Sequence, residues 1–161
     1  RCWGWGRIQW KTERASMSDK RVRLGVEEQL LRKYFPSVRI QDKDGGPNLG
    51  LVGRIHSNSG TVYTLFCPLE EFPERSPPVY VIDPKLRCYD GKLVSDLGSS
   101  NAMHVLAPSE HGHPQICHYN DRYWESKLTL YKVLLKCRIW LEAYECHLRE
   151  GKPVDHYLSH M

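Results

Sequence analysis

A periodic apolar stripe near the C-terminal end of the chain constrains the fold more than any other feature of the sequence. Over residues 126–149, apolar side chains recur at alternating steps of four and three residues. This spacing predicts an amphipathic helix of roughly 36 Å with a single buried face, which needs a second layer to cover it. Ser126 can cap the start of this helix, and Gly151 with Pro153 can end it. The stripe consists of Leu130, Leu134, Cys137, Leu141, Tyr144 and Leu148.

Four short β-rich runs upstream can form that second layer. Turn-forming residues separate them, and the pattern predicts an antiparallel four-stranded meander. The connection before the last run, at residues 68–78, carries four prolines, so we expect an ordered, extended loop with few backbone donors. The runs are residues 38–40, 49–55, 61–67 and 79–82.

A second helix is expected ahead of the strands, over residues 18–35. Ser18 or Asp19 can cap it, and Pro36 ends it because proline disfavours the helical conformation of the residue before it. The order of helix, meander, long loop and long helix predicts an α+β domain with both helices packed on an antiparallel sheet. The apolar stripe expected to be buried is Val22, Val26, Leu30 and Tyr34, with Leu31 and Phe35 beside it.

Residues 1–16 differ in composition from the rest of the chain. They hold three tryptophans without a helical period, and four basic side chains against one acidic side chain supply +3 of the formal net charge of +4. Met17 follows in the context of a natural start, so we expect residues 1–16 to be an added or upstream-translated tail and residues 17–161 to be one domain. A tryptophan-rich anchor is the alternative. The +1 that remains on the domain does not favour nucleic-acid binding.

The cysteines and the hydropathy of the chain indicate its compartment. No run approaches the length of a membrane span and no secretory signal pattern is present, so we expect a cytosolic protein. The six cysteines stand at least nine residues apart without a C-x-x-C pair, which argues against a disulfide framework. Each is then a core side chain, a metal ligand or a nucleophile. Cys137, on the apolar stripe, and Cys146, off it, are expected to be structural.

Chemistry is expected in residues 84–124, which lack a periodic pattern and are rich in Gly, Ser, Asn, His and Pro. Long irregular segments in small domains commonly carry function. Cys117 has three histidines within six residues, and nearby positive charge would lower the pKa of its thiol and favour the nucleophilic thiolate. We expect His113 and His118 to tune the thiol in this way.

Three other interpretations of this cluster remain open. Cys117 can be an inert thiol packed beneath the loop. His111, His113, Cys117 and His118 can be zinc ligands, although structural zinc sites usually draw paired ligands from two separate segments. A cysteine hydrolase would need a histidine base and an orienting Asn or Asp, and no hydrolase signature surrounds Cys117.

The order of elements and several motifs resemble the ubiquitin-conjugating enzymes over about residues 18–150. The motifs are an F-P pair in the proline-rich loop, P-x-V-Y-V in the last predicted strand, P-x-I-C at Cys117, and W-x-x-x-L-T-L leading into the long helix. The resemblance implies a ubiquitin-conjugating-like fold and a catalytic cysteine, Cys117, that carries an acyl group as a thioester. It implies no cofactor and no metal.

Residues 113–115 depart from the family pattern. The conjugating enzymes carry His-Pro-Asn several residues before the cysteine, whereas this chain has H-P-Q close ahead of Cys117. The role of the missing asparagine is then unfilled, or backbone donors, His104 or Asn120 take it. The resemblance also implies that Asn120 or Asp121 orients an incoming lysine.

This departure, together with the sequence K-C-R-I-W-L-E-A-Y-E at residues 136–145, makes the chain similar to the bacterial conjugating proteins of anti-phage operons, in particular the stand-alone type of cyclic-oligonucleotide signalling (CBASS) systems. That resemblance implies that Cys117 bonds to the C-terminal glycine of a cGAS-like cyclic-oligonucleotide synthase and primes anti-phage signalling. A separate activating enzyme would supply ATP-dependent activation, because the chain has no room for an adenylating domain. The alternative is a catalytically inactive conjugating fold that binds a partner protein as a scaffold.

Overall fold

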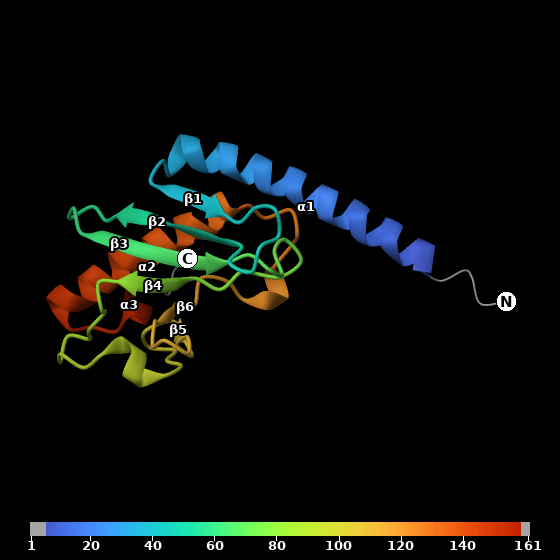
Figure 1. Cartoon of the computed structure of the whole chain (residues 1–161). Coiled ribbons are helices and arrows are strands. Elements are labelled where there is room, and N and C mark those ends of the chain that lie inside the picture. The colour runs from blue at the N-terminus through green and yellow to red at the C-terminus, as the bar shows by residue number, and fades with distance from the viewer. Residues whose placement is uncertain (1–5, 159–161) are drawn as a thin grey trace.

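An antiparallel sheet with helices packed against it forms the body of the protein (Figure 1). The computed structural model describes residues 6–158, with side chains from residue 19 onward. Within these residues the sheet has six strands in the order β1-β2-β3-β4-β6-β5, and three α-helices accompany it. The predicted α+β class is therefore confirmed.

The elements follow one another in simple order along the chain. The strands are β1 (Val38–Gln41), β2 (Gly50–His56), β3 (Val62–Pro68), β4 (Tyr80–Asp83), β5 (Val105–Leu106) and β6 (Gln115–Ile116). The α-helices and the two 3₁₀ turns are α1 (Gly6–Tyr34), η1 (Val94–Leu97), η2 (Asp121–Tyr123), α2 (Leu130–Glu150) and α3 (Val154–Leu158). Helix α2 crosses behind the sheet and α3 packs against α2 (Figure 1).

Strands β1 to β4 form the predicted meander, each antiparallel to the next. Burial alternates along β3, so that Tyr63, Leu65 and Cys67 enter the core while their neighbours are more exposed. The apolar stripe of α2 covers this face of the sheet as expected, except that Leu148 at its last turn is exposed. The buried residues of the stripe are Leu130, Leu134, Cys137, Leu141 and Tyr144.

The sheet also has two strands that the sequence did not predict. β5 and β6 arise within the segment expected to lack regular structure, and they pair through Val105↔Ile116 and Leu106↔Gln115. β6 joins the meander through the pair Tyr80↔Gln115. Strands of two residues are too short to show an apolar period, and their pairing depends on contacts between residues far apart in the sequence.

Helix α1 begins earlier than predicted. Its first residue is Gly6, so Ser18 and Asp19 lie inside the helix and do not cap it. Residues 6–16 of the expected tail are thus part of α1, and residues 1–5 lie outside the described part of the chain. That the tail is separable from the domain stays a prediction.

The buried face of α1 also differs from the prediction. Val22, Val26 and Tyr34 are exposed, whereas the side chains that face the core lie on the adjacent stripe. That stripe has a carboxylate at its centre, so a pattern built on apolar residues alone selected its neighbour. The buried residues are Leu24, Glu27, Leu31 and, just past the helix end, Phe35.

Helix α2 begins at Leu130 rather than near Ser126. Its N-cap is Thr129, whose side-chain oxygen accepts a hydrogen bond from the backbone N–H of Lys132 (3.3 Å). Its end is as predicted, because Gly151 has the left-handed backbone (φ 75°) of a helix C-cap.

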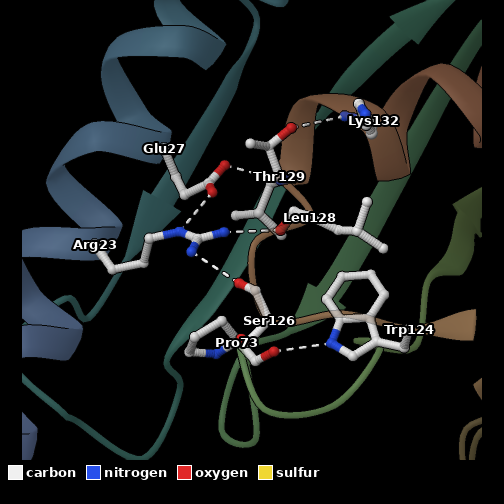
Figure 2. Close-up of polar contacts among 9 residues, drawn as sticks. Arg23, Glu27, Pro73, Trp124, Ser126, Leu128, Thr129 and Lys132 are labelled. Atoms are coloured by element: carbon white, nitrogen blue, oxygen red, sulfur yellow. Dashed lines mark hydrogen bonds and ion pairs between the residues drawn. The ribbon is translucent and has the colours of Figure 1, made fainter.

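A buried ion pair connects α1 to the start of α2 (Figure 2). Arg23 Nε lies 2.9 Å from Glu27 Oε1, and Glu27 Oε2 accepts the backbone N–H of Leu130 (2.8 Å). The two terminal nitrogens of Arg23 donate to the carbonyls of Ser126 and Leu128, each at 2.8 Å. Glu27 therefore satisfies an open amide of the first turn of α2, and Arg23 holds the segment that leads into it.

Replacing Glu27 should cost far more stability than replacing an exposed residue in a pair of the same spacing. Glu27→Ala would leave Arg23 unpaired and the Leu130 amide unsatisfied, so we expect a loss of about 3–5 kcal/mol in the free energy of unfolding, measured with urea. The control is Glu71→Ala, which removes an exposed pair with Arg75 at the same four-residue spacing and should cost less than about 1 kcal/mol. Equal losses in the two variants would contradict a stabilising role for the contacts of Arg23 and Glu27 with the start of α2.

Candidate active site

Cys117 occupies the first position after β6, where the sheet gives way to a loop. Its backbone N–H donates to the carbonyl of His104 (2.9 Å), which continues the β5–β6 pairing by one further hydrogen bond. Its side chain is half-buried. The sheet therefore fixes the backbone of Cys117 while its thiol is partly open to solvent.

Two hydrogen bonds with the β4 region hold the residues that precede Cys117. The N–H of Val81 donates to the carbonyl of Pro114 (3.0 Å), and the N–H of Ile116 donates to the carbonyl of Val79 (2.9 Å). The predicted strand sequence P-x-V-Y-V and the sequence P-x-I-C thus lie side by side in the sheet.

The loop that follows Cys117 is held in place by aromatic side chains. Trp124 Nε1 donates to the carbonyl of Pro73 (2.8 Å), as Figure 2 shows. The rings of Tyr119 and Trp124 meet edge to face with centroids 5.5 Å apart, and Lys136 Nζ lies 4.0 Å from the centroid of Tyr119. These contacts, and those of Arg23 further along, keep the loop against the body of the protein.

The thiol of Cys117 is not activated by its neighbours. Burial raises its pKa above the ordinary range of a cysteine, and the carboxylate of Asp121 raises it further. The lowering expected from the histidines is not found. His118 is half-buried, and desolvation of its ring lowers its pKa to about 4, so the ring is neutral near pH 7. Its Nε2 donates to the carbonyl of Pro77 (2.9 Å).

His113 belongs to a separate turn ahead of β6. Its N–H donates to Ser109 Oγ (3.1 Å), its carbonyl accepts the N–H of Ser109 (2.9 Å), and its ring centroid lies 6.4 Å from that of His111. Among the described residues, no group of three or more His, Cys, Asp or Glu side chains is placed to hold a metal ion. The zinc interpretation finds no support in this region.

Asn120 and Asp121 lie on the loop directly after Cys117. Asn120 Oδ1 accepts the N–H of Arg122 (3.0 Å) and so caps the turn η2, which leaves its Nδ2 as the side-chain donor. Asp121 is the first residue of η2, and its carboxylate is the acidic group that acts on the Cys117 thiol. Both are therefore close to Cys117 along the chain and exposed to solvent.

His104 is near Cys117 through its backbone rather than its ring. Its carbonyl accepts the Cys117 N–H, whereas its Nε2 lies 2.6 Å from Asp155 Oδ1 on α3. The Cys117 amide is consequently not free to stabilise an oxyanion. No sequence pattern indicated Asp155, because a five-residue helix after Gly151 is too short to show a period.

The other described cysteines occupy structural positions. Cys67 and Cys137 are buried, and burial raises the pKa of both thiols, which confirms the expected core position of Cys137. Cys88 lies in a tight turn and burial raises its pKa as well. Cys146 lies half-buried on α2, where its sulfur accepts a hydrogen bond from Arg149 (3.1 Å).

Comparison of the chain with protein-family models, with curated proteins and with solved structures finds no match. Over the described residues, no helix combines the length and apolar character needed to cross a bilayer.

Lowering the pH should destabilise the protein through His118. The pKa of about 4 in the folded chain lies below the value near 6.5 expected after unfolding, so between these values the unfolded chain binds a proton that the folded chain does not. Stability should fall as pH drops from about 6.5 to about 4, with a contribution from His118 on the order of 3 kcal/mol.

The variant His118→Gln should remove this contribution, because glutamine does not titrate. His111→Gln, at an exposed position, is the matched control and should keep the pH dependence of the wild type. Urea unfolding at several pH values measures how the free energy of unfolding depends on pH. An identical pH dependence in wild type and His118→Gln would contradict a neutral His118 in the folded chain.

Proposed function

We propose that this protein is a ubiquitin-conjugating-like transferase in which Cys117 carries an acyl group as a thioester. The donor is the C-terminal glycine of a cGAS-like cyclic-oligonucleotide synthase, activated by a separate enzyme, and the transfer primes anti-phage signalling. The fold is then a variant of the ubiquitin-conjugating type, in which the sheet is extended by β5 and β6. The protein acts in the cytoplasm.

One observation carries the proposal: the motifs on which the resemblance rests contact one another in pairs, just before and just after Cys117 along the chain. P-x-V-Y-V bonds to the residues before Cys117 through Val81 and Val79. Trp124, seven residues after it, bonds to Pro73 of the F-P pair. These segments are separated along the chain, so their pairing before and after Cys117 supports a common role.

The arrangement suits transfer between thiols. In that step the Cys117 sulfur bonds to the carbonyl carbon of the donor thioester, the bond to the donor sulfur breaks, and the thiol proton passes to the departing thiolate. The exchange is nearly balanced in energy, so catalysis rests on position and on donors for the transient oxyanion. Asn120 Nδ2 is the side-chain donor on the loop, since the Cys117 amide is bound to His104.

The second step delivers the acyl group to an amine. The negative charge of Asp121 beside the thioester attracts the ammonium of an incoming lysine and accepts one of its protons, so that the neutral amine can attack the thioester carbon. The S–C bond then breaks, an amide forms, and a second proton of the nitrogen passes to the departing sulfur, which restores the thiol.

A scaffold without catalysis is the second candidate. The raised pKa of the Cys117 thiol favours it, because an uncharged thiol is a poor nucleophile at neutral pH. The missing asparagine of the His-Pro-Asn sequence points the same way. The scaffold would use the same loop as a binding surface and would form no covalent bond.

Gel analysis of protein purified from cells that also express the synthase and the activating enzyme separates the two candidates. The wild type should show an adduct that a thiol reductant removes. Cys117→Ser should show an oxyester that resists the reductant, and Cys117→Lys an amide that also survives hydroxylamine. Cys146→Ser, which changes another half-buried thiol, should behave as the wild type.

An adduct on none of these proteins, together with phage protection by Cys117→Ala, would reject the carrier function and favour the scaffold. Stoichiometric zinc that is lost in Cys117→Ser would reject both.

A further inference from the structure

Asp155 contacts the segment ahead of β5 at two points. Its backbone N–H donates to the carbonyl of Ala102 (2.9 Å), and its carboxylate lies 2.6 Å from His104 Nε2. Asp155 is itself fixed, because α3 packs against α2 and Tyr157 donates to the Glu150 carboxylate (2.8 Å). The C-terminal helices therefore hold residues 102–104 in place.

His104 needs such support because of its backbone conformation. Its φ of 49° lies in the left-handed region, which residues other than glycine rarely adopt. The preceding carbonyl, of Met103, accepts a hydrogen bond from the buried Trp140 Nε1 (3.0 Å). The next carbonyl, of His104, is the one that binds the N–H of Cys117.

We propose that Asp155 is a positioning residue for Cys117. It acts through the His104 ring to hold the His104 carbonyl, and that carbonyl fixes the backbone from which the thiol projects. No hydrogen bond joins the His104 ring to the Cys117 sulfur in the described structure, so the pair works through the main chain rather than as a base. Its part in acyl transfer rests on the function proposed above, whereas its effect on the geometry of Cys117 does not.

The effect of Asp155 on the stability of the protein can be separated from its effect on the reactivity of Cys117. The His104 and Asp155 side chains are 32% and 56% exposed, and a pair this open contributes little to global stability. The position of a reacting atom is far more sensitive, since a displacement of about 1 Å can change a rate on the order of 100-fold. Losing Asp155 should therefore change the reactivity of Cys117 without unfolding the protein.

The test measures alkylation of Cys117 by iodoacetamide, followed on its peptide by mass spectrometry, with hydrogen exchange of the Cys117 amide and the unfolding temperature alongside. Asp155→Ala should raise the alkylation rate at neutral pH about threefold or more and speed exchange of the amide, because the half-buried thiol loses its backbone restraint. The unfolding temperature should stay within about 2 °C of the wild type.

Asp155→Asn should restore the wild-type alkylation rate, since its amide oxygen can accept the same hydrogen bond from His104 Nε2. The matched control is Glu110→Ala. It removes another His–acid pair, in which Glu110 Oε1 lies 3.5 Å from His111 Nε2, and it should leave the alkylation rate of Cys117 unchanged. A wild-type rate in Asp155→Ala would overturn the proposal. A large drop in unfolding temperature shared by Asp155→Ala and Asp155→Asn would overturn it too, because it would show a structural role.

The adduct assay tests the link to acyl transfer. Asp155→Ala should give less adduct than the wild type although its thiol reacts faster with iodoacetamide. The small reagent requires only that the thiol be accessible, whereas transfer from the protein tail requires that the thiol be correctly positioned. A wild type without any adduct would reject the proposed function, and the alkylation rates would still decide the positioning role of Asp155.

Discussion

The ion pair between Arg23 and Glu27 is the constraint on which the rest of the arrangement depends. A carboxylate without partners is costly to bury, and Glu27 is buried because two kinds of donor satisfy it: the guanidinium of Arg23 and the first amide of α2. The positive end of the α2 dipole adds to the attraction. The two long helices are therefore joined by a contact that is favourable only when both are in place.

The same arginine also connects this contact to the loop around the candidate site. Its guanidinium lies 5.3 Å from the ring centroid of Phe72, and the next residue, Pro73, holds Trp124. The chain around Cys117 thus has two supports: strand pairing with β4 and β5 before it, and the contacts of Arg23 and Pro73 with residues 124–128 after it. Neither support brings a positive charge to the thiol, but both determine the position of Cys117.

The parts of this fold that the sequence predicted are those with many repeats of one pattern. Helix α2 shows five regular steps, and the meander shows four β-rich runs separated by turn-forming residues. The prediction found α1 and its end but missed part of its buried face, because that face contains Glu27 and no apolar pattern can include a carboxylate that is satisfied by a distant amide. It failed for β5 and β6 because two-residue strands are defined by their partners alone.

In the candidate site, too, features with a local sequence pattern could be predicted, whereas features that depend on distant contacts could not. Cys117 could be selected from the sequence because it stands among histidines in an irregular segment and within motifs that resemble those of a known family. The protonation state of His118 could not be predicted in this way, because it depends on how far the folded chain desolvates a ring whose Nε2 bonds to Pro77, 41 residues earlier. The contribution of Asp155 could not be predicted either, because it acts on Cys117 through the backbone of His104 and no local sequence pattern indicates it.

A thiol that is positioned but not activated has a consequence for the proposed carrier function. A high pKa makes a sulfur a poorer leaving group, so an acyl group on Cys117 would be held longer against water than one on an acidic cysteine. The carboxylate of Asp121 acts in the same direction, because it repels hydroxide and attracts the ammonium of a lysine. Of the two features that slow the first attack by Cys117, the raised pKa prolongs the lifetime of the thioester, and the Asp121 carboxylate favours approach of the amine that must take the acyl group in the second step.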